Sequence, residues 1–408
     1  MVMKRGIVMI GRKEYLDQLI ASREKNIIKV ITGVRRCGKS TLFELYIDYL
    51  KSTGVTDDQI ISVNLEDIDY EHLLNYKALY EYVKERLQKG KYTYVFIDEA
   101  LSCKGFEKAV DSLYIKPNVD VYITGSNAYM LSGELATLLS GRYITIEMLP
   151  LSFKEYCTAQ TGNGKSMSEN FNDYLRFGSF PYIAQLERNN AAVTPLIDGI
   201  YNTILIKDVA KRKGITVVSL LENIVRFVAS SIGSPISTKK ISDTINSSGR
   251  RISVNTVDSY LRVLTDGYIL YKTDRYDIKE RQFLKTLGKY YIVDTGIRNL
   301  LLSSAESDIG HLIENVVYLE LKRRGYKVNI GKMLENEIDF VASNMDGRTY
   351  YQVSASVLDA GTLEHELAPL RKIPDNHPKL LLTLDEVGAG SNYEGIRQIN
   401  LLHWLLEE

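Results

Sequence analysis

The stretch Gly33-Val34-Arg35-Arg36-Cys37-Gly38-Lys39-Ser40-Thr41 decides the fold of the first part of this chain. It fits the pattern G-x-x-x-x-G-K-[ST], in which two glycines let the backbone curl until successive N–H groups converge on phosphate oxygens. Residues 27–31 before it form a short apolar run typical of a buried strand, and residues 41–50 after it have the apolar spacing of a helix. Strand, glycine-rich loop and helix N-terminus together predict a nucleotide-binding loop.

All nine residues of this loop are therefore candidates to bind the nucleotide. Lys39 is expected to reach the outer phosphates and to contribute to catalysis. Ser40 is expected to offer its hydroxyl to Mg²⁺.

Two adjacent carboxylates support this prediction. The apolar run 92–97 reads as a strand that ends at Asp98 and Glu99, about sixty residues after the loop. Asp98 is placed to hold Mg²⁺, directly or through water. Glu99 points the other way on an extended chain and can polarise a water for attack on the γ-phosphate.

Two further polar side chains are weaker candidates. Asn127 follows the strand 120–124 and is the favoured residue to lie near the γ-phosphate, with Ser126 as the alternative. Arg142 precedes the strand 143–148 and is a candidate arginine finger, either in its own subunit or in a neighbouring one.

The first 150 residues thus contain five expected strands, at 27–32, 60–64, 92–97, 120–124 and 143–148. Helical stretches separate most of them, so an α/β fold with a parallel sheet covered on both faces is expected.

Taken together, Gly11-Arg12-Lys13-Glu14, the loop, and the stretches 95–99 and 123–127 resemble an AAA-type P-loop ATPase. The resemblance is to a prokaryotic group that carries an additional C-terminal region, and it extends to residues 148–156 and 174–181. This group usually has a second glycine where the chain has Ser179, which weakens the case for a sensor-like loop there. The resemblance implies ATP as ligand, the strand order 5-1-4-3-2, and a helical lid after residue 150.

The middle of the chain predicts a winged helix. Residues 151–212 read as the helices of the lid. Helical spacing then recurs at 217–229, 236–245 and 253–264, and strands at 267–271 and 289–293 could form a wing. Residues 213–300 hold 14 lysines and arginines against 8 acids, which makes DNA contact possible, and protein contact is the alternative.

The last region, 301–408, resembles the PD-(D/E)XK nuclease fold. Glu314 lies on an expected helix, Asp339 on a strand, and a second strand follows at 349–353. Active members of that fold carry an acid and a lysine where this chain has Gln352 and Ser354. We therefore expect an inactive, nuclease-like α/β domain without Mg²⁺-dependent cleavage.

Composition agrees with a globular intracellular protein. The 408 residues are 45% hydrophobic and 25% charged, with 51 basic and 51 acidic side chains. No apolar run approaches the roughly 20 residues of a membrane span, and residues 1–11 lack the apolar core of a signal peptide. A cytoplasmic location without membrane contact is expected.

The expected organisation is an ATPase core at 1–150, a lid at 151–212, a winged helix at 213–300 and a nuclease-like domain at 301–408. The expected function is that of a Mg²⁺-dependent ATPase whose hydrolysis drives DNA-associated work. The alternative is an ATP-driven switch that regulates a protein partner without binding DNA. Oligomerisation is possible in either case.

Overall fold

A computed structural model of the chain describes residues 3–4, 7–131, 138–139, 141–210, 215, 217–302 and 309–407. The chain divides into two compact units, one formed by 1–150 with 266–268 and the other by 151–265 with 269–408. The expected boundary between residues 212 and 213 lies outside the described residues.

The first unit contains a parallel five-stranded sheet. Its neighbouring strands, in spatial order, are β4 (Ile60–Asn64), β5 (Thr93–Asp98), β6 (Val119–Gly125), β3 (Ile28–Thr32) and β7 (Tyr143–Glu147). Read from the other edge, this is the expected order 5-1-4-3-2, which the structure confirms. A short hairpin of β1 (Met3–Lys4) and β2 (Ile7–Val8) precedes the sheet.

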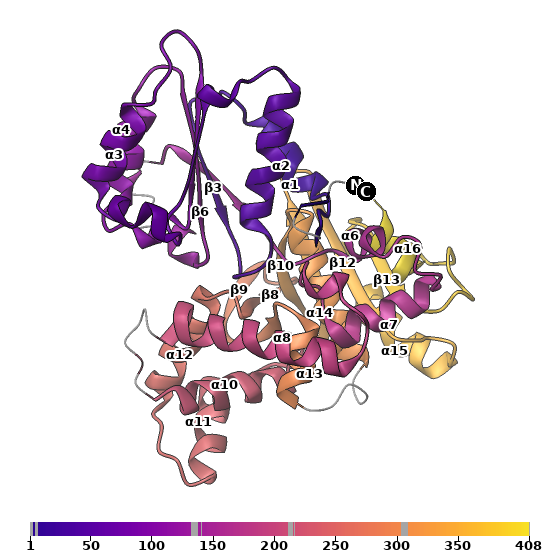
Figure 1. Cartoon of the computed structure of the whole chain (residues 1–408). Coiled ribbons are helices and arrows are strands. Elements are labelled where there is room, and N and C mark those ends of the chain that lie inside the picture. The colour runs from indigo at the N-terminus through magenta and orange to yellow at the C-terminus, as the bar shows by residue number, and fades with distance from the viewer. Residues whose placement is uncertain are drawn as a thin grey trace. The chain divides into compact units, whose positions relative to one another are not determined.

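Helices cover both faces of this sheet. Figure 1 shows α1 (Lys13–Ala21) and α2 (Lys39–Ser52) on one side of the strands, and α3 (Tyr76–Lys84) and α4 (Phe106–Tyr114) on the other. Because both faces of the sheet are covered, β3 and β5 are buried along their whole length rather than at alternate residues.

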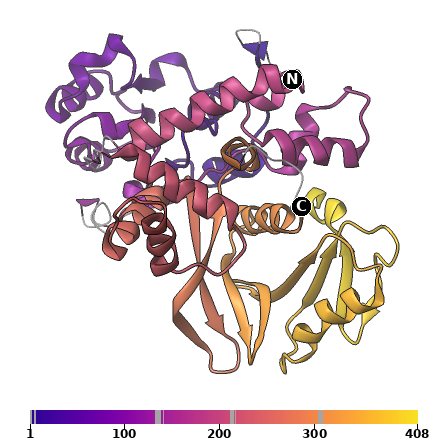
Figure 2. The same ribbon diagram turned by 90° about the horizontal axis from the view of Figure 1, so that it is seen from below.

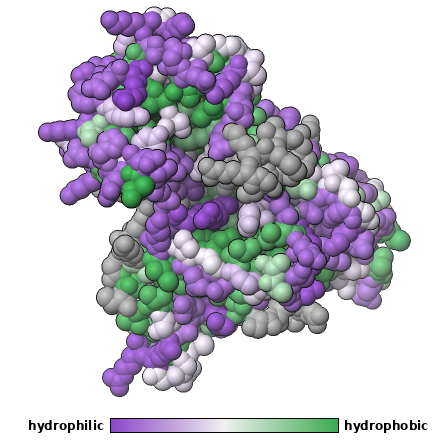
Figure 3. Space-filling model, viewed as in Figure 1, coloured by the Kyte–Doolittle hydropathy of each residue, from purple (hydrophilic) through white to green (hydrophobic). Residues whose placement is uncertain are grey.

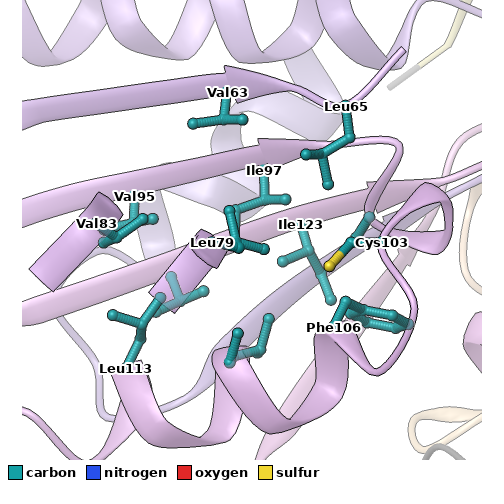
Figure 4. Close-up of a cluster of buried hydrophobic side chains, with 14 of the residues drawn as sticks. Val63, Leu65, Leu79, Val83, Val95, Ile97, Cys103, Phe106, Leu113 and Ile123 are labelled. Atoms are coloured by element: carbon teal, nitrogen blue, oxygen red, sulfur yellow. The ribbon is translucent and has the colours of Figure 1, made fainter. Parts of the chain in front are cut away.

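Aliphatic side chains fill the layer between the sheet and the pair α3 and α4 (Figure 4). Val63, Val95, Ile97 and Ile123 point from three strands toward side chains of both helices, among them Leu79, Val83, Phe106 and Leu113. Each buried side chain of this size contributes about 1.5–3 kcal/mol. This core holds β5 and β6 side by side, and both strands end at the candidate site.

The second unit begins with helices. These are α6 (Phe153–Ala159), α7 (Met167–Phe177), α8 (Asn190–Thr203) with a π-helical continuation (Ile204–Ala210), α10 (Val218–Ser230), α11 (Thr238–Ser247) and α12 (Val254–Asp266). A capping box starts α6, where the Ser152 Oγ accepts from the Glu155 N–H at 3.1 Å and the Glu155 carboxylate accepts from the Ser152 N–H at 2.9 Å. The motif 148–156 thus contains a helix start signal.

An eight-stranded sheet completes the second unit (Figure 2). Its spatial order is β14 (Asn392–Tyr393), β15 (Ile396–Asn400), β13 (Lys379–Thr383), β12 (Gly347–Ser354), β11 (Asn336–Asn344), β10 (Lys327–Met333), β8 (Leu270–Asp277) and β9 (Gln282–Ile292). Its helices are α13 (Thr295–Leu302), α14 (Ile309–Arg323), α15 (Ala360–Arg371) and α16 (Leu401–Leu406).

The expected wing differs from the observed hairpin. β8 and β9 pair with each other, as expected, but they are longer than 267–271 and 289–293 and begin and end elsewhere. In addition, β8 pairs in parallel with β10, with Ile330 opposite Arg275. The hairpin is therefore the edge of the C-terminal sheet rather than a separate wing. The pairing of β8 with β10 joins residues 55 positions apart, and local apolar patterns do not reveal such a pairing.

The motif 174–181 has a structural role in the second unit. Gly178 has φ 82°, and a Cβ atom there would lie 2.2 Å from Asp294 Oδ1. The other oxygen of Asp294 accepts hydrogen bonds from the Ser179 N–H (2.6 Å) and hydroxyl (3.0 Å). Asp294 Oδ1 also accepts from the Ile297 N–H at the start of α13 (3.1 Å). The loop is thus fixed to the N-terminus of α13.

We predict that Gly178→Ala destabilises the second unit more than Gly162→Ala does. Gly162 also has a positive φ, 91°, but nothing lies within 4 Å of its Cβ position, so it controls for a side chain added at positive φ in open space. The clash with Asp294 should add about 1–3 kcal/mol. Urea unfolding followed by the fluorescence of Trp404, the single tryptophan, measures the difference within this unit. Equal midpoints for the two variants would contradict the packing described.

Candidate functional site

The phosphate-binding loop lies between β3 and α2, at the carboxyl edge of the parallel sheet. Gly33 and Gly38 have φ angles of 145° and 104°. A Cβ atom on Gly33 would lie 2.1 Å from the carbonyl oxygen of Met148, so a side chain cannot be accommodated there. Arg36 also has a positive φ, 70°, which is uncommon for a residue with a side chain. The loop has the tight curl of an anion-binding turn that ends at a helix N-terminus.

Lys39 is held inside this loop. Its ammonium donates to the carbonyl oxygens of Gly33 (3.1 Å) and Val34 (3.3 Å), and the residue is only 5% exposed. The same Nζ atom lies 3.8 Å from Glu99 Oε1. The structure therefore brings the loop lysine close to Glu99, the carboxylate that directly follows β5.

The other loop residues have distinct environments. Val34 and Cys37 are buried, whereas Arg36 and Ser40 are exposed and Thr41 is half-buried. Arg35 forms a bidentate ion pair with Glu66, with N–O distances of 3.0 and 2.9 Å. Burial raises the pKa of the Cys37 thiol above its usual value, which disfavours the reactive thiolate.

Arg12, which is distant from the loop in sequence, holds the loop in place through direct hydrogen bonds. Sequence reasoning missed this role. The Arg12 guanidinium is buried and donates to the carbonyl oxygens of Cys37 (2.8 Å) and Leu149 (2.6 Å). These contacts span 25 and 137 residues of sequence. The arginine of the Gly11–Glu14 motif therefore ties the loop to the last residues of the first unit.

Asp98 and Glu99 share a partner on the neighbouring strand. The Thr124 hydroxyl donates to Asp98 Oδ1 and accepts a hydrogen bond from the Glu99 N–H at 2.9 Å. Glu99 has φ 51°, in the left-handed region, so the chain turns sharply at the end of β5. Thr124 was not a candidate from sequence, although its place on β6 beside the end of β5 could have suggested it.

The surroundings of Glu99 favour its use as a base. Burial raises the pKa of its carboxyl group above the usual value, and Asp98 and Glu66 add to the rise, while Lys39 and Arg35 oppose it. A carboxylate with a raised pKa binds a proton more readily, as a general base must.

Ser126, the alternative to Asn127, contacts Glu99. The Ser126 hydroxyl donates to Glu99 Oε2 at 3.2 Å. Asn127 is also buried at this end of β6, and its carbonyl oxygen accepts from the Met130 N–H at 3.2 Å. The structure therefore places both alternatives at the expected edge of the sheet.

Arg142 lies at the wrong end of the sheet to act on its own loop. Its carbonyl oxygen accepts from the N–H of Ile28, the first residue of β3, whereas the loop follows the last residue. Five residues of strand separate the two ends by about 16 Å. The guanidinium lies 3.6 Å from Asp111 and over the ring of Tyr114. The expectation of an arginine finger in the same subunit is therefore corrected.

Ser40 and Asp98 fit a magnesium ion that is also bound by phosphates. A hydroxyl and a carboxylate are hard oxygen ligands, and Mg²⁺ at nucleotide sites takes one or two protein oxygens beside phosphates and waters. Among the described residues, no group of three or more His, Cys, Asp or Glu side chains is arranged to hold a metal by itself.

None of the described helices is long and apolar enough to cross a membrane.

Comparison with known proteins agrees with this geometry. Residues 25–157 match the family described as AAA domain, and residues 168–308 match a family described as Domain of unknown function (DUF8612). The chain is 36% identical over 402 residues to a Haemophilus influenzae protein named Uncharacterized protein, covering 98% of this chain and 99% of that one. It is 31% identical over 335 residues to Uncharacterized protein MJ1544 of Methanocaldococcus jannaschii, covering 78% and 72%.

A solved structure supports the fold. The Walker-type ATPase PABY2304 of Pyrococcus abyssi is similar with a TM-score of 0.52 and 15% identity, over 73% of this chain and 97% of that chain. The AAA-domain match includes the phosphate-binding loop and the Asp98–Glu99 pair, and the first relative spans nearly the whole chain. The chain therefore belongs to one family with these proteins of H. influenzae and M. jannaschii, and its residues 25–157 match an AAA domain.

Proposed function

We propose that the protein binds ATP together with Mg²⁺ and hydrolyses it at the phosphate-binding loop. The observation that carries this proposal is the 3.8 Å approach of the Lys39 ammonium to the Glu99 carboxylate beside that loop. A phosphate-binding cation and a carboxylate of raised pKa are the two groups that hydrolysis of a phosphoanhydride requires at this edge. Adenine as the base follows from membership of the AAA family.

Each group has a separate task. The loop N–H groups and Lys39 bind the phosphates, and Glu99 orients and deprotonates the attacking water. Ser40 and Asp98 would hold Mg²⁺, which neutralises charge on the phosphate oxygens. Thr124 positions Asp98, and Ser126 positions Glu99. Asn127 remains a candidate for contact with the γ-phosphate.

Arg142 is proposed as an arginine finger only toward a neighbouring subunit, since it is remote from its own loop. Such a role requires an oligomer, so the ATPase rate per chain should rise with protein concentration. A rate per chain that stays constant over the assembly range would exclude it.

We predict that Lys39→Ala abolishes nucleotide binding, whereas Glu99→Gln retains binding and lowers turnover by about 10²–10⁴-fold. Lys51→Ala, at the other end of α2, is the matched control and should behave as wild type because Lys51 is exposed and pairs with the exposed Asp57, away from the loop. Binding is measured with a fluorescent ATP analogue and turnover by phosphate release. Wild-type turnover by Lys39→Ala would refute the proposal.

The raised pKa of Glu99 predicts the pH dependence of turnover. The base is active when ionised, so the rate should fall as pH decreases through this pKa. The acid limb of kcat/KM should therefore lie above the usual glutamate value of about 4.3. Initial rates across pH test this, and Ser126→Ala is expected to move the limb to higher pH because a hydrogen bond to the ionised carboxylate is lost. An acid limb at or below the usual value would argue against Glu99 as the base.

We further propose that hydrolysis drives DNA-associated work through residues 213–300, with 151–212 as lid and 301–408 as a nuclease-like domain. The supporting observation is a set of exposed cations on and after α11, namely Lys239, Lys240, Arg250 and Arg251. Figure 3 shows hydrophilic side chains together with neutral and hydrophobic ones over this face of the second unit. The alternative, a switch acting on a protein partner, is favoured by the absorption of the β8–β9 hairpin into a sheet, which leaves no separate wing for DNA among the described residues.

Salt dependence separates the two alternatives. If these cations bind phosphates, DNA affinity should fall steeply with salt, by a slope of about 0.9 in log–log units per phosphate contact. Replacing Lys240, Arg250 and Arg251 together with Ala should lower that slope, and Lys91→Ala on the first unit should not. The measurement is a fluorescence anisotropy titration of duplex DNA. No binding at low salt would favour the partner switch.

A further inference from the structure

The acidic cluster of the C-terminal sheet contains a lysine that its resemblance to a nuclease does not include. Glu314 lies on α14, Asp339 on β11 and Gln352 on β12, as that resemblance implies. The Asp339 N–H donates to Gln352 Oε1 at 3.4 Å, and Asp339 Oδ2 accepts from the Val353 N–H at 2.8 Å. The residues that correspond to the nuclease site thus lie close together in this structure.

Lys289 occupies the middle of this cluster. Its ammonium lies 3.0 Å from Glu314 Oε1 and 2.8 Å from Glu337 Oε1, and its side chain is only 3% exposed. The lysine comes from β9, the strand that sequence analysis assigned to a wing. Lys289 is not at the position where active nucleases of this fold carry their lysine. In this chain that position holds Ser354, whose hydroxyl donates to the Ser356 carbonyl.

Both oxygens of Glu314 are enclosed by protein groups. Oε1 accepts hydrogen bonds from Lys289 and from the Tyr291 hydroxyl at 2.7 Å. A Cβ atom on Gly233 would lie 2.9 Å from Oε2, so the turn after α10 closes over the other side. Next to it, Asn315 exchanges two hydrogen bonds with the backbone of Ile292, at 2.8 and 2.9 Å. These contacts form a continuous polar junction between α14 and β9.

The residues present do not fit a divalent metal. Mg²⁺ requires oxygen ligands at about 2.0–2.1 Å in octahedral geometry, and an ammonium already lies between two of the carboxylates. A second cation beside it would be repelled strongly in a poorly solvated site. With the ammonium between them, the carboxylates do not converge on one point, and the described residues contain no metal-binding arrangement of three or more His, Cys, Asp or Glu side chains.

We propose that the Lys289 ammonium is the resident cation of the cluster formed by Glu314, Glu337 and Asp339, where it excludes a divalent metal and locks β9 onto α14. The C-terminal domain is then a metal-free scaffold, and its lack of cleavage follows from an occupied cation position as well as from Gln352 and Ser354. This inference is independent of the ATP site.

Removal of the ammonium should convert the cluster into a metal site. Lys289→Ala leaves three carboxylates together, and Glu366 adds negative charge that acts on Asp339. The full chain with Asp98→Asn, which removes the carboxylate at the ATP site, is the background for all variants. Isothermal titration with Mn²⁺, without nucleotide, should show no uptake by this background, one Mn²⁺ per chain for Lys289→Ala, and loss of that uptake when Glu314→Gln is added.

Lys289→Met, which keeps the length of the apolar stem, serves as a second variant if Lys289→Ala does not fold, as judged by Trp404 fluorescence. Absence of Mn²⁺ uptake by a folded variant would overturn the claim that the ammonium excludes the metal. Mn²⁺ uptake by the background protein that Glu314→Gln abolishes would also overturn it. So would Mg²⁺-dependent DNA cleavage by wild type that is lost in Lys289→Ala, because the lysine would then serve an active metal centre.

Discussion

The close packing of residues 148–150 against the phosphate-binding loop is the constraint on which the ATP site depends. The Met148 N–H donates to the Thr32 carbonyl at 2.7 Å, and its own carbonyl leaves no room for a side chain at Gly33. Arg12 completes the arrangement by donating to both Cys37 and Leu149. The loop shape is therefore maintained by three segments of the first unit that are far apart in sequence.

The acidic side of the site follows from the register of two parallel strands. Because Ile97 pairs with Ile123, Thr124 lies where its hydroxyl can serve both Asp98 and Glu99. The left-handed turn at Glu99 then directs this carboxylate toward Lys39 while Asp98 remains bonded to Thr124. The acid proposed to bind metal and the acid proposed to activate water thus have different surroundings although they are neighbours in the chain.

Sequence reasoning could propose site residues where the pattern is local. The loop glycines, Lys39 and the two acids are such candidates, since phosphate binding needs a contiguous loop and a strand end, and the structure brings Lys39 and Glu99 close together. It missed Arg12 and Thr124 because their contacts depend on tertiary placement. It wrongly predicted a separate wing at β8 and β9, because the local sequence does not say which strand pairs with the other edge of β8. Lys289 was missed for the same reason, since only that pairing brings it to Glu314.

The most direct test of the ATP site is a crystal structure of the full chain with a non-hydrolysable ATP analogue and Mg²⁺. The account predicts the γ-phosphate within hydrogen-bond distance of Lys39 Nζ, Mg²⁺ bound through Ser40 with Asp98 bonded to it directly or through water, and a water between Glu99 and the γ-phosphate. A nucleotide bound away from residues 33–41, or a γ-phosphate remote from both Lys39 and Glu99, would contradict it.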